Sequence, residues 1–333
     1  MLAVFSCSVV LALFLISAAN DAFAFEKSGG DVTITLKEDA NAAELSAVLK
    51  KAGVIKHRAV FCIYSVLRGR NDFKCGEFTV SGSMSYEEIF FASSGGYRRE
   101  QIRITIPEGL STVEIINIFV SAGIGTRDGF LSALGDDYGY EYIPTDKAER
   151  TFRYDGYLYP DTYFFYSDAS ERDVISKLIA TFDAKFDDDM RKSAAAHGLT
   201  IDECVTLASI IQKEAFYTAE MSGISSVFHN RLRSTSLRRL ESDATVKYAN
   251  DILSFDGEYL TVDSRYNTYK YAGLPPGAIC SPGIFALEAA ASPGKTGYYY
   301  FFSKSDKTFV FSKTYGEHIS NLKKYGVRSE RSK

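Results

Sequence analysis

The sequence is most informative at first for what it contains little of. It has no tryptophan, and only 4 histidines and 5 cysteines in 333 residues. No two cysteines form a Cys-x-x-Cys pair and none lies beside clustered histidines, so no zinc site is expected. No other spacing of metal ligands or cofactor motif is found, and we expect neither a metal nor a cofactor. The positions of the cysteines leave their disulfide state open; they are Cys7, Cys62, Cys75, Cys204 and Cys280.

Positive charge is not in excess either, with 38 Lys and Arg against 42 Asp and Glu. The net charge is −4 at pH 7, and no segment forms the basic stripe that a nucleic-acid backbone requires. Nucleic acid is therefore excluded as an expected partner. Aromatic residues are abundant instead, with 22 tyrosines and 24 phenylalanines. Tyrosine covers apolar surface while its hydroxyl reaches a polar partner, which suits both sugar binding and half-buried strand faces. The chain length allows two modest domains.

The N-terminal segment carries the longest apolar run. Residues Leu2 to Asn20 contain no charge, and a stretch of about 18 apolar residues can span a bilayer as a helix. Ala22-Phe23-Ala24 has the A-x-A pattern of a signal-peptidase site. No Lys or Arg precedes the run, which is atypical of either a membrane anchor or a cleaved signal. Residues 1–24 are therefore expected to be one of these two, and both place the remainder outside the cytoplasm.

The next part of the chain alternates between strand and helix patterns. Val32 to Leu36 and Gln101 to Ile106 alternate as strands, and each leads into an amphipathic helix. The second helix has a capping signal, with Glu114 three residues after Ser111. The two segments look like loose copies of one strand–helix unit. With a junction rich in Tyr, Asp and Gly over residues 125–170, they predict a small βα module over residues 31–155.

The remainder, residues 156–330, is predicted to be a mixed domain. Helical periodicity begins at Arg172, again at Thr200 with Glu203 in the capping position, and again near Ser222. The tail returns to two strands, Tyr298 to Phe302 and Thr308 to Phe311. The whole chain is therefore expected to be α+β.

One carboxylate on the helix from Thr200 is a candidate for catalysis. Leu207, Ile210, Ile211 and Glu214 fall at i, i+3, i+4 and i+7, which places Glu214 on the apolar face. A carboxyl group that lines a cleft on such a face loses solvation in its charged form. Its pKa should rise, as a general acid needs near neutral pH. The alternative is a boundary charge at the solvent edge of the helix.

Two loop segments favour a site near this helix. Proline and glycine cluster in Gly273-Leu274-Pro275-Pro276-Gly277 and again in Ser281-Pro282-Gly283, which predicts a rigid, shaped loop. Rigid loops often carry binding residues. Ser242-Asp243-Ala244-Thr245 precedes an apolar periodic run, and it is either a plain helix cap or part of a substrate site.

Several motifs in a fixed order resemble one family. They are Ile106-Pro107-Glu108-Gly109, Gly156 to Tyr163, Leu207 to Glu214, Val227 to Leu232, Ser242 to Val246, Tyr266 to Tyr269, Gly273 to Gly283 and Phe311 to Tyr315. Together they resemble the endolytic murein transglycosylases (the MltG or YceG-like family), and the resemblance covers nearly all of the chain after the leader. It implies a single-pass protein of the inner membrane, with a LysM-like module and a catalytic domain in the periplasm.

The resemblance also implies a reaction and its partners. The substrate would be nascent peptidoglycan, cut at the MurNAc–GlcNAc β-1,4 bond to leave 1,6-anhydro-MurNAc ends and stop strand elongation. Peptidoglycan synthases are implied as partners. The family's catalytic Glu ends a Glu-Lys-Glu pattern and corresponds to Glu214. Gln212 departs from the first Glu of that pattern, which fits a mechanism with one carboxylate. Glu241 stands where the family more often has Gln, and if it lay close to Glu214, like-charge coupling would raise the pKa of one of the two carboxyl groups.

Four residues are expected to bind substrate: Asn267 and Tyr269 through hydrogen bonds to sugar or N-acetyl groups, with Asn230 and Ser242 as weaker candidates. Loop and cap stabilisation are the competing roles for all four. Two other functions stay open at this point. One is a glycoside hydrolase in which Asp243 or Glu241 activates water. The other is a non-catalytic peptidoglycan-binding scaffold.

Overall fold

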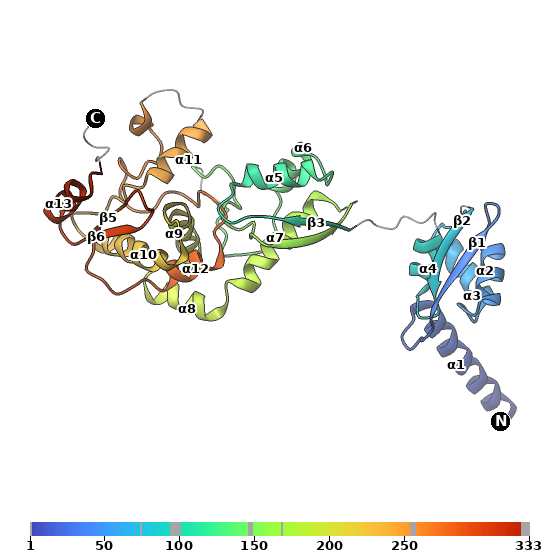
Figure 1. The fold of residues 1–333 in the computed structure, drawn as a ribbon. Helices are drawn as coiled ribbons and strands as arrows, with labels where there is room; N and C mark the ends of the chain where they lie inside the picture. The colour runs from blue at the N-terminus through green and yellow to red at the C-terminus, as the bar shows by residue number, and fades with distance from the viewer. Residues whose placement is uncertain are drawn as a thin grey trace. The chain divides into compact units, whose positions relative to one another are not determined.

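The computed structural model describes residues 2–73, 75–93, 101–145, 149–167, 169–253 and 258–327. The chain forms two compact units, Met1–Glu100 and Gln101–Lys333 (Figure 1). The division differs from the predicted domain limit at residue 155. The reason is long-range strand pairing: Gln101–Thr105 pairs with Thr162–Tyr166, so residues 101–155 fold with the C-terminal part. The described architecture is mixed α+β, as expected.

The smaller unit contains α1 (Leu2–Phe23), β1 (Asp31–Leu36), α2 (Ala42–Lys51), α3 (Arg58–Leu67), β2 (Gly76–Ser81) and α4 (Tyr86–Ser93). Strands β1 and β2 are antiparallel, with Ile34 opposite Phe78, and both of these side chains are buried. The alternating apolar side chains predicted for β1 thus point to one face of the two-stranded sheet, and that face packs on the core. Asn41 caps α2 in a capping box with Glu44.

The end of α1 is part of this core. Asp21, which is 1% exposed, accepts hydrogen bonds of 2.7 Å each from the backbone N–H groups of Lys56 and His57. The Tyr86 hydroxyl donates a third at 2.7 Å, and the Lys27 ammonium lies 3.3 Å from the other carboxylate oxygen. The last turns of α1 are therefore fixed to α3 and α4 by a buried charge and its partners.

Residues 1–24 are expected to be a membrane anchor or a cleaved signal, and the helices of the described residues bear on this expectation. No single helix there combines the length and apolar composition needed to cross a membrane. The helix pair α8 (Asp188–Ala196) and α9 (Ile201–Glu214), bent by 90°, passes the same test by length and composition alone.

The larger unit begins with the same order of elements. It contains β3 (Gln101–Thr105), α5 (Thr112–Ser121), α6 (Arg127–Ala133) and β4 (Thr162–Tyr166), and the two strands are antiparallel with Ile104 opposite Tyr163. The two strand–helix segments are predicted to be alike. In the structure both continue into the same order of strand, helix, helix and strand. The segment expected to be a junction instead contributes α6 and β4 to the larger unit.

Helices form the rest of the larger unit, with one more hairpin. The remaining elements are α7 (Glu171–Lys185), α8, α9, α10 (Thr218–Arg233), α11 (Asp243–Leu253), a short 3₁₀ turn (Tyr259–Thr261), α12 (Ile284–Ala291), β5 (Tyr300–Ser303), β6 (Phe309–Ser312) and α13 (Tyr315–Tyr325). Helix α9 is central, and residues Cys204 to Ile211 are all buried. Both predicted tail strands are present and antiparallel, with Phe301 opposite Phe311.

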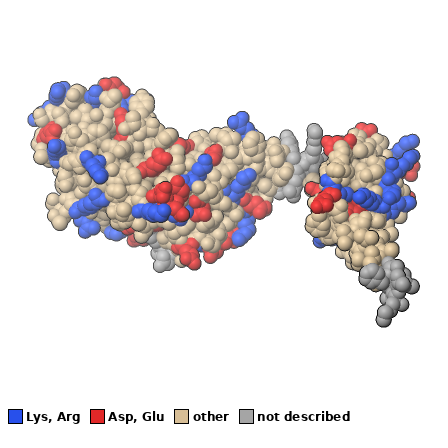
Figure 2. Space-filling view, turned by 90° about the horizontal axis from the view of Figure 1, so that it is seen from below, with Lys and Arg blue, Asp and Glu red and all other residues tan. Residues whose placement is uncertain are grey.

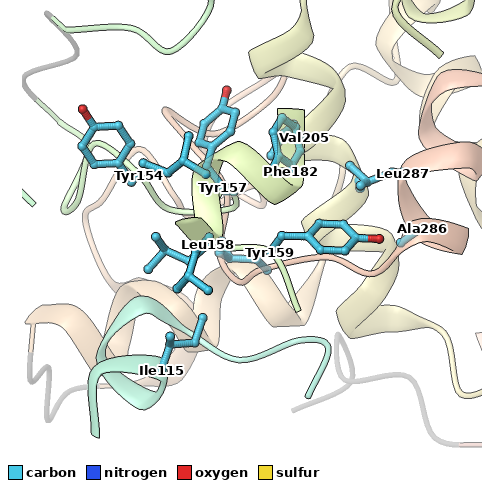
Figure 3. Close-up of a cluster of buried hydrophobic side chains, with 14 of the residues drawn as sticks. Ile115, Tyr154, Tyr157, Leu158, Tyr159, Phe182, Val205, Ala286 and Leu287 are labelled. Carbon is cyan, nitrogen blue, oxygen red and sulfur yellow. The ribbon is translucent and has the colours of Figure 1, made fainter. Parts of the chain in front are cut away.

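Figure 3 shows side chains from several elements converging on this core. Tyr157, from the loop before β4, packs beside Phe182 of α7 with ring centroids 5.0 Å apart. Gly156 has φ of +89°, and a Cβ there would lie 2.6 Å from side-chain carbons of Val205 and Ala278. Only glycine fits this close approach, which accounts for the first residue of the Gly156 to Tyr163 motif.

The cysteines within the described side chains are free thiols: Cys62, Cys75, Cys204 and Cys280. Burial raises the pKa of both Cys204 and Cys280 to about 12. A thiol with so high a pKa is a poor nucleophile, so these two act as small apolar core residues.

Candidate active site

Glu214 is the last residue of α9, where that helix leaves the core. It lines two cavities of the larger unit, of about 370 and 860 Å³. Asp243, at the start of α11, lines both cavities as well. The apolar face of α9 is buried in the core and fixes the helix. The carboxyl group at the end of α9 therefore lies where the two cavities meet.

Two groups from the start of α11 hold the Glu214 carboxyl. The Ser242 hydroxyl donates a hydrogen bond to its Oε1, and the backbone N–H of Ala244 donates another. The pKa of Glu214 is raised from 4.5 to about 7, because burial, together with the negative charge of Asp243, outweighs the opposing effect of these two hydrogen bonds. The direction agrees with the expectation from the helix pattern. A carboxyl group with this pKa can both donate and accept a proton near neutral pH.

Tyr269 is connected to the same cluster. Its hydroxyl donates a hydrogen bond of 2.7 Å to Oδ1 of Asp243, and its ring lines the smaller cavity. Burial, followed by the hydrogen bond and charge of Asp243, raises the pKa of this hydroxyl above its ordinary value. Tyr269 therefore stays a neutral donor, and its direct partner is Asp243.

Glu241 has a different role from the one expected. Its carboxylate pairs with the guanidinium of Arg231 at 2.9 Å, and its backbone has φ of +55°. The charge that raises the Glu214 pKa comes from Asp243. The pairing with Arg231 fixes the turn that delivers Ser242 to Glu214.

Asn267, one of the predicted substrate-binding residues, lies inside the loop that carries Tyr269. It is completely buried, and its amide nitrogen donates to the carbonyls of Leu260 and Val262 at 2.9 Å each. Its amide oxygen accepts from the backbone N–H of Tyr269 at 3.1 Å. With the amide saturated and no exposed surface, Asn267 shapes the loop that presents Tyr269, and it does not reach either cavity.

Asn230 and Ser242 are also occupied within the protein. The Asn230 amide donates to the carbonyls of Thr296 and Tyr298 at 3.0 and 2.9 Å, which attaches α10 to the chain entering β5. Ser242 is 3% exposed and serves Glu214 directly. Of the four predicted substrate-binding residues, Tyr269 is the one that lines either of the two cavities beside Glu214.

Thr268 is a residue of this site that sequence reasoning missed. Its hydroxyl accepts from the backbone N–H of Ser242 at 3.0 Å and lies 2.8 Å from the Thr245 hydroxyl. Its carbonyl accepts from Glu241 N–H at 3.3 Å. These bonds join the Tyr266 to Tyr269 loop to the turn before α11. The only sequence signal for Thr268 was its place inside one of the recognised motifs.

The Pro/Gly-rich loop is attached to the same helix as Glu214. The Gln212 side-chain oxygen accepts from Gly283 N–H at 3.0 Å, and the Ser209 hydroxyl accepts from Ile279 N–H at 3.0 Å. Ser281 and the Gly109 to Leu110 segment exchange two backbone bonds of 2.8 Å. Three separate motifs therefore meet around the end of α9, and Gln212 acts as a hydrogen-bond acceptor for the loop.

A buried ion pair supports the loop from behind. The guanidinium of Arg150 lies 2.6 Å from Asp202, with both side chains at most 5% exposed, and it also donates to the carbonyl of Pro276 at 3.3 Å. The Tyr157 hydroxyl donates to the same Asp202 oxygen at 2.9 Å. Removing one partner of a buried ion pair leaves an uncompensated charge, which is strongly destabilising. Because Arg150 is held by this pair and also bonds to Pro276, it keeps the loop rigid.

Asp155 is a second carboxyl group with a raised pKa. It lines the larger cavity and accepts hydrogen bonds of 2.6 Å from each of the Thr112 and Tyr248 hydroxyls. Burial raises its pKa to about 6 despite these bonds. Within the described ranges, no group of histidine, cysteine and carboxylate side chains could hold a metal ion.

Charge is mixed around the larger unit. On the face drawn in Figure 2, patches of Lys and Arg alternate with patches of Asp and Glu over this unit. A polyanion would meet carboxylates as well as cations on this face. The two cavities, rather than a charged surface, are the features of this unit that suit a ligand.

Comparison with known proteins agrees with the motif pattern. Residues 34–324 match the YceG-like family. A protein of Bacillus subtilis (strain 168) named endolytic murein transglycosylase is 30% identical over 313 residues, which cover 88% of this chain and 84% of that protein. A protein of the same name from Streptococcus pneumoniae serotype 2 (strain D39 / NCTC 7466) is 29% identical over 81% of this chain, but the chain spans only 54% of its length.

A solved structure has the same fold. The crystal structure of a YceG-like protein from Listeria monocytogenes aligns with a TM-score of 0.56 and 28% identity, over 88% of this chain and 100% of that one.

Proposed function

The chain belongs to the YceG-like family, and on this premise we propose that it is an endolytic murein transglycosylase. Its substrate is the glycan of nascent peptidoglycan, cut at the MurNAc–GlcNAc β-1,4 bond to leave 1,6-anhydro-MurNAc ends. Cutting within nascent strands terminates their elongation. The observation that carries the proposal is the placement of Glu214, a carboxyl group with a pKa of about 7 at the junction of two cavities.

The two cavities support cleavage within a strand. An enzyme that cuts inside a polymer must hold sugar units on both sides of the scissile bond. Glu214 and Asp243 line both cavities, so a strand that occupies both places its bond over these carboxyl groups.

The proposed chemistry uses Glu214 twice. The protonated carboxyl group donates its proton to the glycosidic oxygen as the bond from that oxygen to MurNAc C1 breaks. The resulting carboxylate is held by the Ser242 hydroxyl and the Ala244 N–H. It then takes the proton from the MurNAc 6-hydroxyl, whose oxygen bonds to C1. This closes the anhydro ring and restores the protonated Glu214.

A hydrolase in the same cleft is the first alternative. Inverting hydrolysis needs a second carboxylate that activates water. Glu241 is paired with Arg231, and Oδ1 of Asp243 accepts the Tyr269 hydrogen bond, so both are engaged in holding the site. These contacts favour the lytic reaction with one catalytic carboxyl group.

A non-catalytic glycan-binding scaffold is the second alternative. Such a protein has no need of a carboxyl group whose pKa is raised to about 7 and whose anion is stabilised by two donors. The Glu214 environment therefore favours catalysis.

The proposal includes an N-terminal anchor in the inner membrane, with the larger unit in the periplasm. The exposed apolar side chains of α1 support it, among them Val10, Leu11, Leu13 and Ile16. Cleavage after Ala24 would remove Asp21, which is buried among partners from the turn before α3 and from α4, so the contacts favour a retained helix. The strand–helix–helix–strand order of β1 to β2 supports a LysM-like module. Peptidoglycan synthases, as the source of nascent strands, are the proposed partners.

Product analysis tests this function. Purified glycan strands are incubated with the full chain in detergent, and the new ends are identified by mass. Anhydro-MurNAc ends support the lytic reaction. Reducing ends, one water heavier, identify a hydrolase, and binding without cleavage identifies a scaffold.

A further inference from the structure

The smaller cavity has an aromatic wall that comes from the C-terminal hairpin and helix. Besides Glu214, its lining includes Tyr299, which precedes β5, the β5 residues Tyr300, Phe301 and Phe302, and the α13 residues Tyr315 and His318. No motif in the sequence assigned a role to β5, because a run of tyrosine and phenylalanine is equally typical of a buried strand.

The two faces of β5 have different surroundings. Phe301 faces the core, with its ring 5.7 Å from Phe228 in an edge-to-face contact. Tyr300 alternates to the other face, where it contacts Tyr315 at 5.8 Å and His318 at 5.3 Å. Every residue of β5 nonetheless keeps part of its surface open to solvent. The Phe301 face of the strand therefore packs on the core and the Tyr300 face packs with α13, while all four residues of β5 line the cavity.

Tyr315 is the most accessible part of this wall. It is 48% exposed although it lines the cavity, and it starts α13 beside His318 at 6.4 Å. Its ring does not belong to the buried core. An apolar ring held in place at the edge of a hollow is typical of ligand sites.

Arg231 joins this wall to the candidate catalytic turn. Its guanidinium lies 5.1 Å above the Tyr300 ring, and its Nε donates to the Tyr299 carbonyl at 2.7 Å. The same guanidinium pairs with Glu241, one residue before Ser242. The wall is thus fixed relative to Glu214 by one buried side chain.

We infer that Tyr300, Tyr315 and His318 form a glycan subsite, on which one amino-sugar ring of the strand packs on the smaller-cavity side of Glu214. The inference rests on the proposed function for the identity of the ligand. A pyranose ring has an apolar C–H face that packs on an aromatic ring, while its hydroxyl and N-acetyl groups need polar neighbours. The rings of Tyr300 and Tyr315 supply the face, and the Tyr hydroxyls and the imidazole supply polar partners at its rim.

The test compares Tyr315→Ala with a matched control on the same helix. Tyr325 is 43% exposed, also lies on α13 and does not line either cavity, so Tyr325→Ala removes a similar ring outside the subsite. Both changes are made in the full chain in detergent, and folding is checked by circular dichroism. Glycan-strand binding is measured in the Glu214→Gln background, and cleavage is measured with Glu214 present.

The subsite predicts that Tyr315→Ala weakens strand binding and raises KM about tenfold, with kcat changed by less than about threefold. Tyr315→Phe, which keeps the ring, should lose less than Tyr315→Ala, and Tyr325→Ala should bind strands like the parent. Equal binding by Tyr315→Ala and the parent overturns the subsite. If the wild type does not cleave strands but Tyr315→Ala still loses strand binding, the proposed function is overturned. The subsite remains supported in that case.

Discussion

The Ser242 hydroxyl donates a hydrogen bond to Glu214 Oε1 from a turn 28 residues further along the chain. This contact brings the end of α9 to the start of α11. Thr268, Glu241 and Arg231 hold the turn in place. The proton affinity of Glu214 is therefore set by a turn that the chain builds from three separate motifs.

The first prediction concerns the alkaline limit of activity. As a general acid with a pKa of about 7, Glu214 should lose activity as the pH rises through that value. Asp243→Asn removes a negative charge and keeps an oxygen that accepts the Tyr269 hydrogen bond. The pKa of Glu214, and with it the alkaline limit of activity, should therefore move down by roughly 0.5–1 pH unit. Ser242→Ala removes a donor to the carboxylate, so the limit should move up. Rate–pH profiles measure both, and shifts of the same sign would contradict this account.

The second prediction concerns stability and pH. The Glu214 pKa is about 7 in the folded state and 4.5 in the unfolded state, so the folded chain holds the extra proton between these values. This contribution is full below the unfolded value and is lost as the pH rises through the folded one. Glu214→Gln lacks the titration. Relative to that variant, the wild type should lose about 2 kcal/mol of unfolding free energy between pH 5 and pH 8.

Urea unfolding of both proteins at the two pH values measures this difference. The other titrating groups, Asp155 among them, are common to both proteins and cancel in the comparison. A difference that does not change with pH would mean that Glu214 has an ordinary pKa.

The third prediction concerns Gln212. Its side-chain oxygen accepts a hydrogen bond from Gly283 N–H, and a carboxylate oxygen can accept the same bond. Gln212→Glu should therefore keep activity within about threefold, whereas Gln212→Leu should lower kcat/KM about tenfold or more because the loop loses its attachment. Steady-state cleavage rates compare the two. Equal rates for Gln212→Leu and the wild type would remove Gln212 from the positioning of the loop.

The fourth prediction concerns the N-terminal helix. Asp21→Ala would leave the Lys27 ammonium, which is 6% exposed, buried without its carboxylate. Breaking one side of such a pair should destabilise the smaller unit by about 3 kcal/mol or more. A chain starting at residue 26 should show the same loss. Limited proteolysis of the smaller unit measures it, with Glu38→Ala, an exposed carboxylate of that unit, as the control. An unchanged digestion rate would argue that α1 is not part of this core.

Local patterns predicted the helices and the candidate carboxyl group well. The capping boxes at Ser111 and Thr200 are present as expected, and Glu214 lies where the periodicity of α9 placed it. These features depend on neighbours within one or two turns, which the sequence shows directly.

Features that depend on distant partners could not be predicted. The domain limit at residue 100 follows from pairing of Gln101–Thr105 with Thr162–Tyr166, and either strand alone could have joined another sheet. Asn267 has a side chain of the kind that often binds sugars. Its amide nitrogen instead donates hydrogen bonds to carbonyls of its own loop. From the sequence, Tyr300 is indistinguishable from a core residue of a strand. Its contact with Tyr315 of α13 becomes apparent only in the structure.

The most direct test compares the full chain with Glu214→Gln on purified glycan strands at pH 6–7, with the new ends counted by mass. The account predicts anhydro-MurNAc ends from the wild type, a rate about 10²–10⁴ times lower in the variant, and strand binding unchanged between the two. Anhydro ends formed at equal rates by both proteins would contradict the role of Glu214. Reducing ends from the wild type would contradict the lytic reaction.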